Sequence, residues 1–255
     1  MEPAIELLQF HYSHFNEKVR WALDFKQVPH RRHSYLPGPH IPAIRRLTGQ
    51  TKTPVVRFGD TLVHGTARII DELETRYAEP PLYPEAPDQR ERALELQRWF
   101  DEDVGPAVRC ALFAEMIGEL GYLGRLFAGE KSFMVRTLYR GSLPFVRGLM
   151  RKGNGITGPD AVAAARARTR EALDFVTRET AESGYLVGGR FSVADLTAAA
   201  LLAPAANPPG VPTISKPEPM PASVKAWHAE WADHPGVAWV HAQFARHRPA
   251  SAAIS

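Results

Sequence analysis

Residues 13–23 read SHFNEKVRWAL and follow the short apolar run IELLQF of residues 5–10. The run is apolar enough for a buried strand. In the quoted stretch, apolar residues recur at helical spacing from Phe15 to Leu23, with charged residues on the opposite side. Ser13 is a preferred N-cap residue. We therefore expect a strand, a turn and a helix that begins beside the end of that strand.

Outward from this helix, strand and helix patterns alternate. Pro29 ends the first helix. The expected elements that follow are a strand in residues 31–36, a short helix around residues 41–47, strands at residues 54–58 and 61–63, and a helix over about residues 66–77. Gly59 and Asp60 form a hairpin signature, so the last two strands must be antiparallel. The order βαβαββα predicts a thioredoxin-like α/β domain.

A proline-dense stretch at residues 80–88 predicts a linker. It divides the chain into a thioredoxin-like domain, residues 1–79, and an all-helical domain, residues 89–255. The helical patterns run over residues 89–127, 132–152 and 160–183, start again at Ser192, and end in two helices that carry Trp227, Trp231, Trp239 and Phe244. Ser192 and Asp195 have the spacing of a capping box. The proline-rich residues 204–221 are expected to form a surface excursion.

Composition excludes several function classes. The 255 residues are 44% hydrophobic and 23% charged, which is ordinary for a globular protein. A net charge of +3 gives no reason to expect a nucleic acid partner. Cys110 is the single cysteine, so no intramolecular disulfide or CxxC pair can form, and the scattered histidines predict no metal site. The start MEPAIELLQF lacks a signal peptide pattern, so we expect a cytoplasmic protein.

Ser13 is the first candidate for chemistry. Its hydroxyl and the first-turn amides would point at one spot, which attracts an anion. A thiolate there would gain a charge-assisted hydrogen bond of ~1.5–3 kcal/mol and ~0.3–1 kcal/mol from the helix terminus. Together these lower the pKa of a bound thiol by roughly one to three pH units. The alternative is that Ser13 serves only as an N-cap, which the local sequence by itself favours.

SHFNEKVRWAL resembles the glutathione transferase segment S-P-x-x-x-K-V-R. The resemblance implies that Ser13 activates the thiol of glutathione, with the neighbouring phenol of Tyr12 as the rival for that role. His14 stands where proline is common in the family. Asn16 stands where thiol-disulfide relatives have a second cysteine, so the resemblance does not extend to disulfide reductase chemistry.

The segment GQTKTPVVRF, residues 49–58, resembles the V-P-x-L segment of that family. The resemblance implies that Pro54 is cis and that the backbone of Thr53 pairs with the cysteinyl part of glutathione. Gln50 and Lys52 fall where relatives bind the glycyl carboxylate. For Lys52, a solvated charge is an equal alternative.

HGTARIIDELE, residues 64–74, resembles the family segment E-S-x-A-I-x-x-Y-L, which holds the γ-glutamyl end. Thr66 falls on the serine and Gly65 on the acidic residue. The usual partner of the γ-glutamyl ammonium is therefore missing. Asp71 or an acid of a partner chain is a possible substitute.

GYLVGGRFSVADLTAAALLAP, residues 184–204, closely matches the family signature of a buried, capped helix. By resemblance, an electrophile site would lie between Ser13 and the helical domain, and its candidate wall residues are Phe100, Val104, Val108, Phe113 and Met116. These residue types are more often core. We interpret Cys110 as a small buried hydrophobe.

Arginines interleave with large apolar residues within residues 127–156. A helix that lies on a membrane surface is one interpretation, and a solvated helix face is the favoured one. Membrane contact is thus not expected.

The sequence leaves three functions open. The leading one is an enzyme that conjugates glutathione, as co-substrate, to a small hydrophobic electrophile without a metal. The second is a noncatalytic protein that binds hydrophobic ligands or partners, and the third is a glutathione-dependent isomerase or dehalogenase. The resemblance also implies a homodimer.

Overall fold

A four-stranded sheet organises the N-terminal part of the chain in the computed structural model, which describes residues 5–211 and 217–254. The strand order is β2-β1-β3-β4, with β1 parallel to β2 and antiparallel to β3. The elements are β1 (Ile5–Gln9), α1 (His14–Phe25), β2 (His30–Ser34), α2 (His40–Thr48), β3 (Val55–Phe58), β4 (Thr61–His64) and α3 (Thr66–Arg76). This order confirms the predicted thioredoxin-like arrangement, including the antiparallel β3–β4 hairpin.

The two faces of the sheet bury different side chains because successive residues of a strand point to opposite sides. Leu7 and Val56 belong to the main core, which includes residues of α1 and α3. Leu8 and Val55 pack with Ile44 of α2 on the other face. The alternation on β1 and β3 therefore fixes which helix covers which face.

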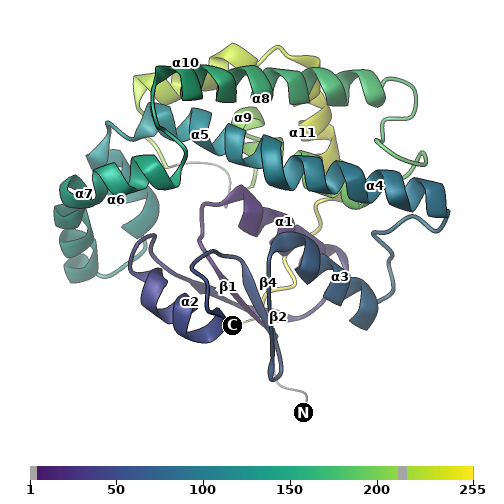
Figure 1. Ribbon diagram of the computed structural model, residues 1–255, viewed down its shortest axis with the longest axis horizontal. Helices are drawn as coiled ribbons and strands as arrows, with labels where there is room; N and C mark the ends of the chain where they lie inside the picture. The colour runs from purple at the N-terminus through teal and green to yellow at the C-terminus, as the bar shows by residue number, and fades with distance from the viewer. Residues whose placement is uncertain (1–4, 212–216, 255) are drawn as a thin grey trace.

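All elements after residue 86 are helical within the described residues, and they form a layer beside α1 (Figure 1). They are α4 (Pro87–Trp99), the π-helical turn η1 (Phe100–Val104), α5 (Gly105–Met116), α6 (Leu120–Ala128), α7 (Phe133–Gly153), α8 (Pro159–Glu179), α9 (Val193–Ala206), α10 (Ala222–Trp231) and α11 (Pro235–His247). The predicted all-helical character of this domain is confirmed.

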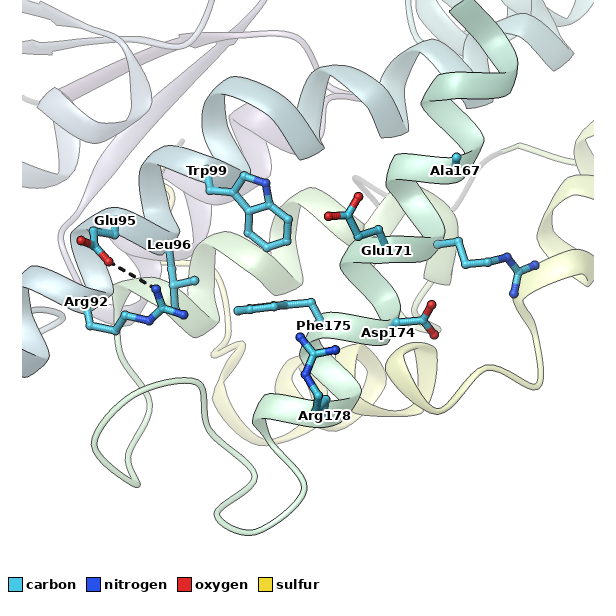
Figure 2. Close-up of a pocket in the computed structure, with 10 residues that line it drawn as sticks. Arg92, Glu95, Leu96, Trp99, Ala167, Glu171, Asp174, Phe175 and Arg178 are labelled. Atoms are coloured by element: carbon cyan, nitrogen blue, oxygen red, sulfur yellow. Dashed lines mark hydrogen bonds and ion pairs between the residues drawn. The ribbon is translucent and has the colours of Figure 1, made fainter. Parts of the chain in front are cut away.

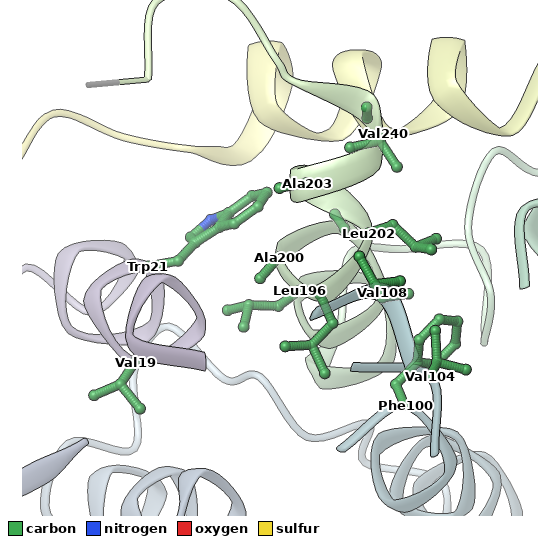
Figure 3. Packing of buried hydrophobic residues seen from close by; sticks show 14 of the residues in the cluster. Val19, Trp21, Phe100, Val104, Val108, Leu196, Ala200, Leu202, Ala203 and Val240 are labelled. Atoms are coloured by element: carbon green, nitrogen blue, oxygen red, sulfur yellow. The ribbon is translucent and has the colours of Figure 1, made fainter. Parts of the chain in front are cut away.

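Helix α9 is the centre of the helical layer, since every one of its residues is buried. Figure 3 shows its side chains packed with residues of α1, η1, α5 and α11. At its start, the predicted capping box is present: Asp195 Oδ2 accepts hydrogen bonds from the backbone N–H of Ser192 (2.9 Å) and from its hydroxyl (3.0 Å). This cap satisfies polar groups that would otherwise be buried without partners.

Two details of the helical domain differ from the sequence predictions. The single pattern over residues 89–127 divides into α4, η1, α5 and α6, with a break at residues 117–119. Pro204 lies buried inside α9, so the proline-rich excursion starts later than predicted. The apolar periodicity of the sequence continues across short breaks between helices, so it could not predict where this pattern divides. Part of the predicted excursion, residues 212–216, lies outside the described residues.

Helix α1 is buried on all sides, including the side that carries its charged residues. Glu17, Lys18 and Asp24 are each at most 1% exposed. The reason is its place between the sheet and the helical layer (Figure 1). The ion pairs that compensate these charges are Glu17 with Arg20 and Arg248, Asp24 with Arg32 and Arg248, and Lys18 with Asp101.

Helix α7 lies at the edge of the helical layer next to α6 and exposes much of its apolar surface. Phe145 is 90% exposed and Met134 78% exposed. Its inner face is anchored by Tyr139, whose hydroxyl donates to the carbonyl of Pro37 at 3.1 Å. Among the residues that the structure describes, none of the helices combines the length and the hydrophobicity that a membrane span requires.

Candidate functional site

Ser13 caps the N-terminus of α1, where β1 ends. Its Oγ accepts a hydrogen bond from the backbone N–H of Asn16 at 3.4 Å. The buried side chain of Arg20 holds the backbone that leads into this cap, since its guanidinium donates to the carbonyls of Phe10 (3.2 Å) and Ser13 (3.3 Å). The Ser13 hydroxyl hydrogen has no acceptor among the described residues. Ser13 is thus an N-cap whose O–H can still donate to a ligand.

Asn16 connects this helix start to the loop before Pro54. Its Nδ2 donates to the hydroxyl of Thr53 at 3.3 Å, and its side chain is fully buried. The Thr53–Pro54 peptide is cis, as the resemblance implies. The structure therefore brings Ser13 and Thr53, 40 positions apart in the sequence, to the same end of the sheet. This contact of Asn16 could not be predicted from the sequence, because its partner Thr53 lies 37 positions away.

Gln50 and Lys52 belong to the loop that leads to Thr53. The Gln50 amide group donates to the hydroxyl of Thr48 at 2.9 Å and to the carbonyl of Lys52 at 3.0 Å, while its oxygen accepts from the Lys52 N–H. The Gln50 side chain thus stabilises its own loop, and the Lys52 side chain is exposed. Binding of a glycyl carboxylate by either remains a prediction.

His40 holds the same loop from α2. Its Nε2 donates to the carbonyl of Thr51 at 2.9 Å, while Nδ1 accepts from the N–H of Gly38 at 3.0 Å. These two roles define the neutral tautomer. Burial lowers the pKa of His40, which keeps the ring in that neutral form.

Thr66 begins α3, and Gly65 precedes it as an N-cap that has no side-chain hydrogen bond. Gly65 has φ of 87°, a left-handed conformation that favours glycine. An acidic side chain at this position would be strained in this backbone conformation. The first-turn amides of α3 are left for a ligand or for water.

The sequence did not indicate two further residues near this site, Lys18, which contacts Thr66, and Asp101, which contacts Lys18. The buried ammonium of Lys18 donates to the Thr66 hydroxyl at 3.4 Å and to Asp101 Oδ2 at 2.6 Å. The other oxygen, Asp101 Oδ1, is buried without a hydrogen-bond partner among the described residues. Asp71, the acid considered from sequence, is instead hydrogen-bonded by the hydroxyl of Tyr83. Lys18 follows Ser13 by more than one helical turn and Asp101 lies in the helical domain, so only the fold shows their proximity.

Tyr12 stands next to Ser13 and is half-buried. Burial raises the pKa of its phenol, and the negative charge of Glu130 raises it further. Tyr12 is therefore a neutral hydrogen-bond donor at neutral pH and is not a phenolate base. Both Tyr12 and Ser13 can donate a hydrogen bond to an anion in front of α1.

A pocket of about 50 Å³ opens at Tyr12 and Ser13, between α1 and the helical domain. Its apolar walls come from α5, α6 and α9 and consist of Leu112, Phe113, Met116, Leu126, Phe127 and Pro204. His14 and Arg109 complete the lining. Of the predicted wall residues, Phe113 and Met116 line this pocket.

The other three predicted wall residues, Phe100, Val104 and Val108, are completely buried. Figure 3 shows them packed beside α9. The prediction was wrong for these three because the π-helical turn and α5 direct that face of the chain into the core. Cys110 is buried, and burial raises the pKa of its thiol, in keeping with a structural role.

A second hollow, of about 710 Å³, lies between α4 and α8 (Figure 2). Trp99 and Phe175 meet there edge to face, with ring centroids 4.9 Å apart. Arginines and acidic residues share its rim, and Arg92 pairs with Glu95 at 3.3 Å. None of its lining residues belongs to the pocket at Ser13, so the two sites are separate.

Comparisons with known proteins agree with this arrangement. The glutathione S-transferase N-terminal domain family matches residues 7–81, and the glutathione S-transferase C-terminal domain family matches residues 159–238. No curated protein matches the sequence significantly.

Several solved structures share the fold. FzlA from C. crescentus is 21% identical with a TM-score of 0.57, over 97% of this chain and 96% of that one. The beta-etherase LigF from Sphingobium sp. strain SYK-6 is 16% identical with a TM-score of 0.62, over 94% of this chain and 100% of that one. A theta class glutathione S-transferase from Xanthomonas axonopodis pv. citri, with glutathione bound, is 20% identical with a TM-score of 0.55, over 92% and 95%. With both domain families matched in order, the chain belongs to the glutathione S-transferase family.

Proposed function

We propose that the protein is a glutathione transferase that joins the sulfur of glutathione to a small hydrophobic electrophile. The observation that carries the proposal is the open N-cap of α1. The Ser13 hydroxyl lines the same pocket as the apolar side chains of α5 and α6. A thiolate held by the cap would therefore face an apolar binding space.

Glutathione itself would lie along the cis-proline loop and the start of α3. The backbone of Thr53 would pair with the cysteinyl part, and the Thr66 end of α3 would bind the γ-glutamyl carboxylate. Gln50 and Lys52 are the proposed groups for the glycyl carboxylate, which requires Gln50 to give up contacts in its loop.

Asp101 is the proposed substitute for the acid missing at Gly65. Its Oδ2 already pairs with Lys18, and its buried Oδ1 has no described hydrogen-bond partner. A ligand ammonium next to Thr66 would supply that partner. The Lys18–Asp101 pair has a net charge of zero. It would therefore not disfavour a ligand that brings both an ammonium and a carboxylate.

The chemistry would consist of thiolate stabilisation and proximity. The thiol loses its proton to solvent, and the anion is held by hydrogen bonds from Ser13 or Tyr12 and by the helix start. The sulfur then attacks the electrophilic carbon. Ser13 would be a hydrogen-bond donor to sulfur throughout and would not itself form a covalent bond.

Three further properties are part of the proposal. We propose a cytoplasmic protein, a homodimer in which the N-terminal domain of one chain contacts the helices of the other, and a role in detoxification. Each rests on the family alone.

A noncatalytic protein of the same fold is the second candidate. The observations that favour it are the absence of an acid at Gly65 and the exposed apolar surface of α7, where Phe133 is 74% exposed. A protein of this kind would bind apolar ligands or partners without turnover.

Retention on glutathione-agarose, combined with conjugation of chlorodinitrobenzene, separates the two candidates. The transferase proposal expects retention and activity in the wild type, and a loss of activity in Ser13→Ala. Tyr12→Phe tests the rival donor. Ser142→Ala on α7, outside the pocket, is the matched control. Retention without conjugation of any electrophile would favour the noncatalytic candidate.

A further inference from the structure

Arg109 is a cation of the Ser13 pocket that the proposed thiolate chemistry does not require. It lies on α5 and lines the pocket together with Tyr12 and Ser13. Its Nε is buried and has no hydrogen-bond partner among the residues that the structure describes. Its guanidinium stands 5.7 Å from the centroid of the Phe15 ring, a contact with an aromatic face and not with a carboxylate.

The most deeply buried Lys and Arg side chains of the described chain are each paired with an acid. Lys18 pairs with Asp101, Arg20 with Glu17, Lys26 with Glu74 and Arg248 with Glu17. For Arg109, the structure gives no ion pair within the described residues. Arg109 is half-buried, and a buried polar atom such as its Nε is costly to a fold when it has no partner. The arrangement thus provides a site for a negative charge that the protein itself does not fill.

The surroundings of Arg109 support the same conclusion. Besides Arg109, the pocket is lined by apolar side chains, a phenol, a serine and a histidine, and none of the described residues that line it is acidic. Glu130, the acid that affects Tyr12, is exposed and is not among the lining residues. Burial lowers the pKa of Arg109, yet an arginine stays charged at any physiological pH.

We propose that Arg109 is a specificity-determining residue that binds a carboxylate on the electrophile. This inference rests on the proposed transferase function. The substrate class is then a compact apolar electrophile with one anionic group, whose carboxylate pairs with Arg109 while its reactive carbon faces the sulfur at Ser13. For an aryl chloride, the C–S bond forms, the C–Cl bond breaks and chloride leaves with the electron pair.

The test compares a chloronitrobenzoate with the matching chloronitrobenzamide, which has the same shape without the charge. Each kcat/KM is divided by the uncatalysed rate with glutathione, so that intrinsic reactivity cancels. We expect the acid to exceed the amide by about tenfold or more in the wild type, the size of a charge-assisted hydrogen bond. Arg109→Gln should lower this acid-to-amide ratio about tenfold, and Arg109→Lys should lower it less. Arg147→Gln, on the exposed side of α7, should leave the ratio unchanged.

Three results would overturn the inference. The first is a wild-type ratio of one or below, which needs no variant and so does not depend on the folding of Arg109→Gln. The second is an unchanged ratio in Arg109→Gln together with a raised KM for glutathione, which would assign Arg109 to glutathione and leave the transferase function standing. The third is failure of both substrates with no retention on glutathione-agarose, which would overturn the proposed function as well.

Discussion

Helices α1 and α9 both begin with a serine N-cap, and the two caps differ in what the third helical residue does. At α9, Asp195 returns to the cap and receives hydrogen bonds from the Ser192 N–H and hydroxyl. At α1, the corresponding residue is Asn16, which reaches away to Thr53 at 3.3 Å. The α9 cap is closed by its own chain, whereas the Ser13 hydroxyl keeps a hydrogen to donate.

This difference separates a structural helix start from one that can bind a ligand. An aspartate at the third position neutralises the cap and would repel an incoming thiolate. Asparagine at that position adds no charge, and its bond to Thr53 supports the neighbouring loop instead. The residue three positions after the serine therefore decides between the two roles.

The largest effect is expected from opening the closed cap with Asp195→Ala. The carboxylate accepts from the N–H of Leu186 at 2.8 Å and from two groups of Ser192, so its loss leaves buried donors without partners. We expect the free energy of unfolding to fall by about 3–5 kcal/mol. Urea denaturation measures this change. A loss below about 1 kcal/mol would contradict the structural role of the closed cap.

A second effect follows from the pH dependence of the same carboxylate. Burial raises the pKa of Asp195 to about 6, although hydrogen bonds from Leu186 and Ser192 oppose the rise. The folded state thus holds this proton more tightly than the unfolded chain, in which the pKa is about 3.9. The stabilisation is complete below about pH 4 and is lost as the pH rises to about 6, by up to about 3 kcal/mol. The free energies of unfolding of the wild type and Asp195→Asn can be compared by denaturation between these pH values. The wild type should lose stability relative to Asp195→Asn as the pH rises, and a constant difference between the two would refute the expectation.

Ser13→Ala should affect chemistry more than stability. Loss of the hydrogen bond to sulfur should lower the conjugation rate by roughly tenfold to a hundredfold. The unfolding free energy should fall by only about 1 kcal/mol, the usual value of an N-cap. Ser192→Ala is the matched comparison, and it should affect the free energy of unfolding more than the conjugation rate. Equal rate losses in both variants would remove the functional distinction between the caps.

Asn16→Asp should convert the open cap into one that resembles the closed cap. The added carboxylate would raise the pKa of a bound thiol and lower the conjugation rate at neutral pH by about tenfold. Asn16→Ala controls for loss of the Thr53 contact, because it adds no charge. A smaller rate loss in Asn16→Asp than in Asn16→Ala would show that charge at this position is unimportant.

The sequence was sufficient for the fold because the decisive signals are local. The hairpin at Gly59, the periodic helices and the Ser192–Asp195 spacing each depend on residues close together in the chain. The family segments also located Ser13, Thr53 and Thr66, whose proposed roles still await an experiment.

Contacts between segments that are distant in the chain could not be predicted from the sequence. Lys18 and Asp101 are far apart in the chain, and nothing in either segment indicates that they pair. The sequence does not distinguish Arg109 from the other arginines, because only the fold shows that it has no ion pair with a described acidic residue. Helix periodicity likewise could not show that α1 is buried on both sides, because its charged residues are compensated only by Arg248 and other distant partners.

The most direct test is a titration of the glutathione thiol bound to the wild-type protein, followed by the ultraviolet absorbance of the thiolate. The open cap at Ser13 predicts a pKa roughly one to three pH units below that of a free cysteine thiol, about 8.5, and a smaller decrease in Ser13→Ala. A bound thiol that titrates like the free one, or no complex at millimolar glutathione, would contradict the account.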